Sequence, residues 1–381
     1  MAYDSVDKLQ KVLVRDVFHY AKDAKKAAGR ALGTLVEIIT FYLLKSWGFE
    51  HSVAIERSLA EYGNPEITHN VEYSLHPILR AIKFPLTNPK MPITSGRILE
   101  SIDGEKFSLA GFEKSGTTLL TTGGILRNSC VVADGKISRL VATLGQVNKD
   151  KFIVVLAEQF SKPYAIFECK RVGIEEGMKK GPQTIEKAKQ GAYVAKSISA
   201  LHKLRTPTGE LRGLIYKTDG TLYSKPYAEL VTEITSSSDA DLLRDFVLTV
   251  GVVSNHGNWF TSEDHNKELR VLAQSYDWLL FLTDQGLSEF ITELLLRPSR
   301  LLEPARNAFL ASYTGKRTKN QFTKVQMNYE ADRVLQKYFS DNSARIENWF
   351  NIIGPTRSSL RKLRAELSQL RDKNWGRLHS L

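Results

Sequence analysis

Glu168 and Lys170 stand two residues apart in the apolar run KPYAIFECK, residues 162–170. Successive side chains of a strand point to opposite faces, so these two share one face while Phe167 and Cys169 share the other. A carboxylate is a ligand for a hard cation, and a neighbouring ammonium can stabilise negative charge that develops on phosphorus. The pair is therefore the first candidate for chemistry in this chain.

A second apolar strand, DKFIVVLAEQ, precedes this run and is separated from it by a short polar turn. If the two form a hairpin centred near residue 160, Asp150 lies beside Lys170 and close to Glu168. Two carboxylates about 4 Å apart repel each other unless a cation lies between them, and carboxylate oxygens suit Mg²⁺. The sequence thus predicts a Mg²⁺ site of Asp150 and Glu168, with Lys170 positioning the attacking water.

This set of residues, Asp150 with Glu168-Cys169-Lys170, resembles the PD-(D/E)xK nuclease superfamily. The size of the chain, the helix before the core and the basic balance look most like a type II restriction endonuclease. The resemblance covers roughly residues 30–255. It implies an α/β fold with a restriction-endonuclease-like core, in which helices flank a mixed sheet.

Two residues, Asp150 and Asp134, are candidates for the first acid of the motif. Lys149 precedes Asp150, where the name of the family would have proline. Asp134, in VVADGKIS, is the alternative, but it would need a long excursion before the catalytic strand. Asp150 is preferred.

The resemblance implies two further site residues. Gly29, Gly33 and Glu37 recur every four residues on one helix face, and Glu37 would be the helix acid that contributes to the metal site in many such nucleases. Gln190 would match a glutamine on the helix after the motif. The alternatives are an ordinary half-exposed glutamate and a glutamine that faces solvent.

Hydrophobic periodicity outlines the elements. We expect two helices within residues 5–47, a strand in HNVEYSLH, a helix over 183–204 and a strand in FVLTVGVVS. From about residue 265 the chain looks helical to its end, and the last helix carries an apolar stripe of Leu360, Leu363, Leu367 and Leu370. The predicted domains are a nuclease core with N-terminal helices, 1–265, and a helical, basic C-terminal region, 266–381, for DNA contact or dimerisation.

Charge points to a polyanion as partner. The net charge is +11, and from residue 301 onward 15 Lys and Arg face seven Asp and Glu. A concentrated basic excess suits the phosphates of nucleic acid. The candidate DNA-binding residues lie in YTGKRTKNQF and in the final helix: Lys316, Arg317, Lys319, Arg361 and Lys362. The alternative is a basic surface whose charges lie in solvent.

Other features exclude classes of protein. The two cysteines, Cys130 and Cys169, do not suit a disulfide framework, and the N-terminus has no apolar signal core, so we expect a cytoplasmic protein and no membrane span. No Gly-rich phosphate loop occurs, so we expect no nucleotide cofactor. His69, Glu72 and His76 alternate on a strand, which disfavours a zinc site.

The resemblance implies Mg²⁺-dependent, site-specific cleavage of double-stranded DNA, as in a type II restriction enzyme, by a homodimer with one site per strand. Two alternatives remain. One is a repair or junction-resolving nuclease of the same superfamily, and the other is a non-catalytic DNA-binding protein whose acid and lysine form only a surface ion pair.

Overall fold

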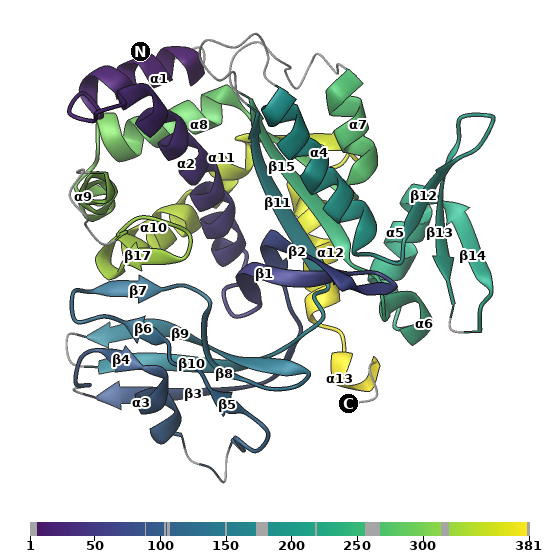
Figure 1. Cartoon of the computed structure of the whole chain (residues 1–381), viewed down its shortest axis with the longest axis horizontal. Helices are drawn as coiled ribbons and strands as arrows, with labels where there is room; N and C mark the ends of the chain where they lie inside the picture. Colours follow the sequence, from purple (N-terminus) through teal and green to yellow (C-terminus); the bar gives the residue numbers. More distant parts are fainter. Residues whose placement is uncertain are drawn as a thin grey trace. The chain divides into compact units, whose positions relative to one another are not determined.

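The computed structural model describes residues 6–87, 89–102, 104, 107–148, 151–172, 182–217, 219–255, 267–313 and 320–378. It is a mixed α/β structure with several sheets (Figure 1). Its contacts divide the chain into two units, each assembled from three segments. Unit 1 comprises Met1–Ile55, Ile78–Ser161 and Gln285–Ile346, and unit 2 comprises Glu56–Pro77, Lys162–Asp284 and Glu347–Leu381. The division of function at residue 265 stays a prediction.

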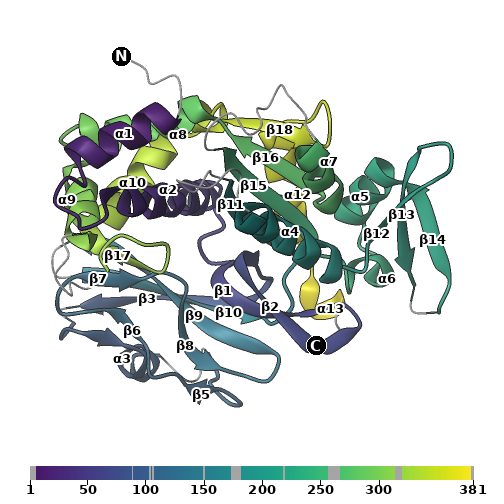
Figure 2. The ribbon, with the colours of Figure 1, turned by 45° about the horizontal axis from the view of Figure 1, so that its top comes forward.

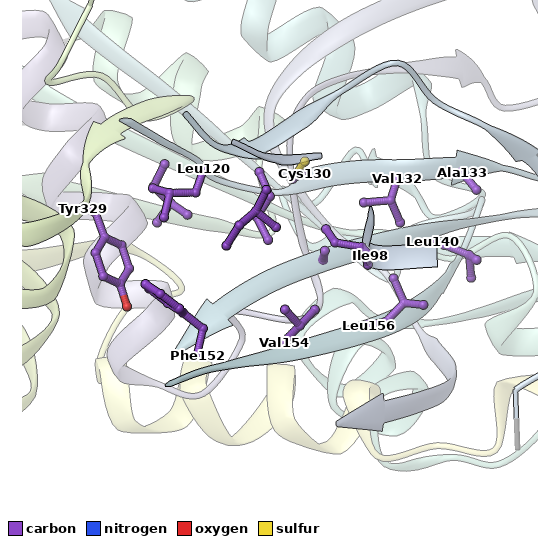
Figure 3. Packing of buried hydrophobic residues seen from close by; sticks show 14 of the residues in the cluster. Ile98, Leu120, Cys130, Val132, Ala133, Leu140, Phe152, Val154, Leu156 and Tyr329 are labelled. Carbon is purple, nitrogen blue, oxygen red and sulfur yellow. The ribbon is translucent and has the colours of Figure 1, made fainter. Parts of the chain in front are cut away.

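Unit 1 contains two β-sheets that share a core (Figure 3). Their apolar side chains, Leu120, Cys130, Leu140 and Leu156 among them, form one buried cluster. In order across the first sheet, the strands are β3 (Ile78–Thr87), β10 (Lys151–Phe160), β9 (Ser138–Asn148), β8 (Cys130–Asp134) and β5 (Glu113–Lys114). The second sheet is β17 (Gln326–Asn328), β7 (Ile125–Arg127), β6 (Thr118–Leu120) and β4 (Ile93–Thr94).

Helices complete unit 1. They are α1 (Val6–Asp16), α2 (Ala24–Ser46), α3 (Ser95–Glu100), α8 (Asp284–Ile291), a π-helical turn (Thr292–Leu296), α9 (Glu303–Ser312), α10 (Tyr329–Asp341) and α11 (Ser343–Glu347). The side chain of Asp23 caps α2 by accepting a hydrogen bond from the Lys26 N–H. By length and composition α2 could cross a membrane, and 67% of that apolar window is buried inside the structure, as in a core helix. The two predicted N-terminal helices are confirmed.

Unit 2 is built on a six-stranded mixed sheet (Figures 1 and 2). Its order is β1 (Val53–Glu61), β2 (Asn64–Leu75), β11 (Ala165–Val172), β15 (Leu248–Asn255), β16 (Trp278–Leu282) and β18 (Phe350–Gly354). The three central strands β11, β15 and β16 are parallel, and β2 and β18 pair with them antiparallel. Central parallel strands are buried on both faces, which explains their nearly continuous apolar runs.

Helices cover both faces of this sheet. On one face α4 (Pro182–Ser197) and α7 (Lys267–Ser275) pack on Val253 and Leu279. Trp278 points to the opposite face and donates its indole N–H to Glu366 of α12 (Leu360–Arg371). A second sheet, β12 (His202–Arg205), β13 (Leu211–Tyr216) and β14 (Leu222–Pro226), lies in unit 2 with α5 (Tyr227–Ser236), α6 (Ala240–Leu243) and α13 (Trp375–Leu378).

Two sequence predictions were wrong. The predicted hairpin between the strands before and after residue 160 does not form, because β10 pairs with β3 and β9 whereas β11 pairs with β2 and β15. The C-terminal part is not wholly helical, since β16, β17 and β18 lie within it. The first error arose because sequence neighbours need not be sheet neighbours, and the second because short strands lack a clear period. The predicted helix over 183–204 ends at Ser197 and is followed by β12.

The leucine stripe of α12 is confirmed, because all four of its leucines are buried. Replacing Leu363, which is fully buried, with Ala should lower the free energy of unfolding by about 2–5 kcal/mol through lost apolar contact and a residual cavity. Arg364→Ala, at the exposed next position, is the control and should change it by about 0.5 kcal/mol or less. Chemical denaturation measures both, and equal effects would contradict the packing of α12.

Candidate active site

Strand β11 carries the Glu168 and Lys170 side chains into the interior of unit 2. Its neighbours are β2 on one side and β15 on the other, and Glu168 stands directly beside Gly251 of β15 in the parallel register. Glu168 is only 3% exposed, whereas 30% of the Lys170 side chain reaches solvent. The carboxylate is therefore the buried end of the site and the ammonium group lies toward its opening.

Both oxygens of Glu168 have a partner. Oε2 lies 3.0 Å from Lys170 Nζ, and Oε1 accepts a hydrogen bond of 3.3 Å from the backbone N–H of Glu72 on β2. A buried carboxylate is costly unless it is paired and hydrogen-bonded, so these contacts compensate for its burial. The predicted pairing of Glu168 with Lys170 on one face of a strand is confirmed by this geometry.

The two groups influence each other's ionisation. Burial raises the pKa of Glu168 above its usual 4.5, although the charge and hydrogen bond of Lys170 act in the opposite direction. Burial disfavours the charged form of Lys170 as well, but the attraction of Glu168 outweighs this and the pKa of Lys170 is raised. Lys170 thus stays an ammonium group at neutral pH. The charge of Glu72, on the adjacent strand β2, also raises both pKa values.

Helix α4 approaches the pair at Gly191. A Cβ atom at this position would lie 2.8 Å from the hydroxyl oxygen of Tyr276, 3.2 Å from Lys170 Cε and 3.7 Å from Glu168 Oε2. Any larger residue would therefore enter the space above the carboxylate. The 2.8 Å distance shows that a third side chain, the phenol of Tyr276, also lies next to Gly191. Burial, followed by the charge of Glu168, raises the pKa of Tyr276, so the phenol remains a neutral hydrogen-bond donor.

The position of Tyr276 depends on β15. A Cβ atom at Gly251 would lie 2.8 Å and 2.9 Å from two ring carbons of Tyr276, so only glycine leaves room for the ring. The next residue, Asp277, accepts hydrogen bonds of 2.7 Å and 2.9 Å from the backbone N–H and hydroxyl of Thr249. Lys203 donates to the backbone oxygen of Tyr276. These bonds fix the backbone on which the phenol stands.

Sequence reasoning missed Glu72 and Tyr276 as members of the site. Glu72 was weighed only as a zinc ligand with His69 and His76, and His69 instead lies 2.7 Å from Glu61. A signal was present in the sequence, because Glu72 is an acid on the polar face of a half-buried strand. Tyr276 gave no comparable signal.

Asp150, the predicted first acid, lies outside the described residues. The hairpin that placed it beside Lys170 is absent, so that geometric argument no longer supports it. The rival acid, Asp134, is exposed at the end of β8 and forms an ion pair of 2.9 Å with Arg139 in unit 1.

The two residues implied by the resemblance have different surroundings. Glu37 lies on α2 in unit 1, where its Oε2 is 3.3 Å from Lys324 Nζ. Gln190 is exposed on α4, one residue before Gly191. Their catalytic roles stay predictions.

The predicted DNA contacts fall into two groups. Lys316, Arg317 and Lys319 lie outside the described residues. Arg361 and Lys362 are exposed on the first turn of α12, and Lys362 Nζ is 3.8 Å from Glu366. Basic side chains on an exposed helix turn remain suitable for phosphate, although their binding to DNA stays a prediction.

No cluster of three or more His, Cys, Asp or Glu that could hold a metal ion occurs within the described ranges. Comparison with known proteins finds no matching family model, curated protein or solved structure. Any inference about function must come from the residues themselves.

The space required by Tyr276 can be tested at Gly251. Gly251→Ala should lower the free energy of unfolding by about 1–3 kcal/mol, because a methyl group there would overlap the buried ring of Tyr276. Gly145→Ala on β9 is a matched control, since the nearest atom to a Cβ there is 3.9 Å away. Thermal and chemical unfolding measure both variants. If Gly251→Ala is as stable as the control, Tyr276 does not occupy this space.

Proposed function

We propose that this protein is a Mg²⁺-dependent endonuclease that cleaves double-stranded DNA at specific sites, in the manner of a type II restriction enzyme. The observation that carries the proposal is the buried Glu168 carboxylate, 3.0 Å from Lys170 on the central strand β11, with another acidic residue, Glu72, on the adjacent strand β2. Strands β2, β11 and β15 with helix α4 also agree with a restriction-endonuclease-like core.

The residues fit the metal ion that this proposal requires. Burial penalises the charge of Glu168, and the nearby charge of Glu72 adds repulsion. A divalent cation between the two carboxylates would relieve both effects. Glu168 and Glu72 would hold Mg²⁺, which would supply an acidic bound water and neutralise charge on the phosphate.

The remaining side chains have separate roles. Lys170, charged and partly exposed, would contact the attacking water or a phosphate oxygen and stabilise negative charge as the bond to the leaving oxygen breaks. It cannot take up a proton while it is an ammonium group, so its role is orientation and charge stabilisation. Tyr276 would restrict the space beside Glu168, because its ring fills the gap left by the two glycines.

DNA binding would rely on the positive charge. The net charge of +11 favours a polyanionic substrate, and Arg361 and Lys362 would contact phosphates. Cutting both strands with one site per chain would require two chains related by a two-fold axis, so we propose a homodimer and a palindromic target.

The direct test is incubation of plasmid DNA with the protein and Mg²⁺. Discrete fragments support a site-specific endonuclease. Preference for branched substrates indicates a junction-resolving enzyme instead, and intact DNA together with a gel shift indicates a binding protein without nuclease activity. Either of the last two results would overturn the proposed restriction activity.

Site variants test the assignments. Glu168→Gln and Lys170→Ala should each lower the cleavage rate by about 10²-fold or more, since each removes charge from the reacting centre. Lys162→Ala, an exposed lysine just before β11, is the matched control and should retain activity. DNA binding in Ca²⁺ should persist in all three, which separates loss of chemistry from misfolding. Full activity of either site variant would remove that residue from the mechanism.

Two further variants decide whether Glu72 or Asp150 is the acid that acts together with Glu168. Glu72→Gln should weaken the response of cleavage to Mg²⁺, because a carboxylate next to Glu168 is lost. Asp150→Asn is the comparison. If Asp150→Asn abolishes cleavage and Glu72→Gln does not, Asp150 is the metal ligand that the sequence predicts. Glu72 is then excluded from the metal site.

The raised pKa of Glu168 predicts how pH affects the metal requirement. A proton held on this carboxylate competes with the cation, so lowering the pH should increase the Mg²⁺ concentration needed for half-maximal cleavage. Because the pKa lies above the usual 4.5, the increase should begin at a higher pH than for an ordinary glutamate. Titrations at about pH 5.5 and about pH 8 measure this effect. An unchanged half-maximal concentration would contradict it.

A further inference from the structure

Unit 1 contains a cavity of about 370 Å³ that has no part in the proposed cleavage. Its walls come from α2, β3, β7, β9, β10 and α10, so residues distant in the sequence meet there. The volume lies within the range of about 300–1,000 Å³ that is typical of small-molecule sites. The wall combines a buried acid, apolar side chains and basic side chains, and each of these constrains the ligand.

The buried end of the cavity contains Asp332, which is 3% exposed. The hydroxyl of Tyr42 and the ammonium group of Lys45 both donate to its Oδ1, each at 2.8 Å. Its Oδ2 accepts no hydrogen bond from the described part of the chain. Asp332 Oδ2 can therefore accept a hydrogen bond from an N–H group of a ligand.

The middle of the cavity is mostly apolar. The Phe41 ring, Leu126 and Ile153 line it, and the polar groups of Thr143 and Gln336 stand among them. Thr143 is already engaged, since its hydroxyl lies 2.9 Å from His51 Nδ1. Apolar side chains with a few hydrogen-bonding groups suit a flat heteroaromatic ring.

Two basic residues lie toward solvent. Lys83 on β3 is exposed and Arg127 on β7 is half-buried, and both line the cavity. Neither takes part in an ion pair with any residue that the structure describes. Their charges are therefore open to an anionic group of a ligand, and arginine and lysine both suit phosphate.

We propose that this cavity binds a single nucleotide, with an amino or N–H group of the base donating to Asp332 and the phosphate facing Lys83 and Arg127. Asp332 would accept from the edge of the base, and the apolar walls would contact its two faces. The outer cations, Lys83 and Arg127, would bind the phosphate. The nucleotide comes either from solution or from a DNA strand, whose base is then turned out of the stack. The proposal does not rest on cleavage at Glu168.

The test is binding of deoxynucleoside monophosphates and their nucleosides to the full chain without Mg²⁺, measured by calorimetry. Each base has an N–H or amino donor that a carboxylate can accept, so the monophosphates are compared with one another and with their nucleosides. Lys83→Glu should weaken dCMP binding about tenfold or more but leave deoxycytidine unaffected, because only the nucleotide carries a phosphate. Lys151→Glu, another exposed lysine of the same sheet, is the matched control and should change neither.

A second variant blocks the cavity. Gln336→Trp, at a half-buried position on α10, should abolish binding of nucleotide and nucleoside alike while thermal unfolding shows a folded protein. Competition with a single-stranded oligonucleotide identifies the source. If the oligonucleotide binds more tightly than dCMP and loses affinity in Gln336→Trp, the base comes from DNA; if dCMP binds without displacing it, the ligand is free nucleotide.

Two results would overturn the proposal. One is the absence of measurable binding of any of the monophosphates, together with oligonucleotide affinity that is the same in Gln336→Trp and the unaltered chain. The other is nucleotide binding that Gln336→Trp leaves unchanged, since the nucleotide would then bind elsewhere. A failure of the plasmid assay affects neither measurement, so the two proposals stand or fall separately.

Discussion

The contact between Glu168 and Lys170 imposes the main constraint on unit 2. A carboxylate that is 3% exposed is stable only with close partners, and β11 supplies one of them two residues away on its own face. The second partner is a backbone N–H of β2, which requires β2 to be the antiparallel neighbour of β11. The strand order thus supplies one of the two partners of the buried carboxylate.

Space around this pair is controlled by glycine. Gly191 lets α4 approach Lys170 and Glu168, and Gly251 leaves the volume that the ring of Tyr276 fills. A glycine inside a helix costs about 1 kcal/mol relative to alanine, so its presence in α4 indicates a packing requirement. The backbone of Tyr276 is in turn fixed by Asp277 and Lys203. The site thus combines a buried charge with close packing that depends on a glycine in the helix and another in the neighbouring strand.

Unit 1 also has a buried carboxylate, Asp332, but its hydrogen bonds are distributed differently. Both hydrogen bonds to Asp332 end on one oxygen, whereas the two oxygens of Glu168 have separate partners. Asp332 Oδ2 therefore stays available to a ligand in the proposed nucleotide site. The two buried carboxylates thus meet the cost of burial with different sets of partners.

The sequence by itself determined the local features: the N-terminal helices, the strands around Val71, Glu168 and Val250, the leucine stripe of α12, and the common face of Glu168 and Lys170. These depend on periods of 3.6 or 2 residues, which are visible in the order of residues. Only the tertiary structure decided that β11 pairs with β2 instead of β10, and hence that the backbone N–H of Glu72 bonds Glu168. Strand pairing and the approach of Tyr276 depend on contacts between distant segments, and no local period encodes them.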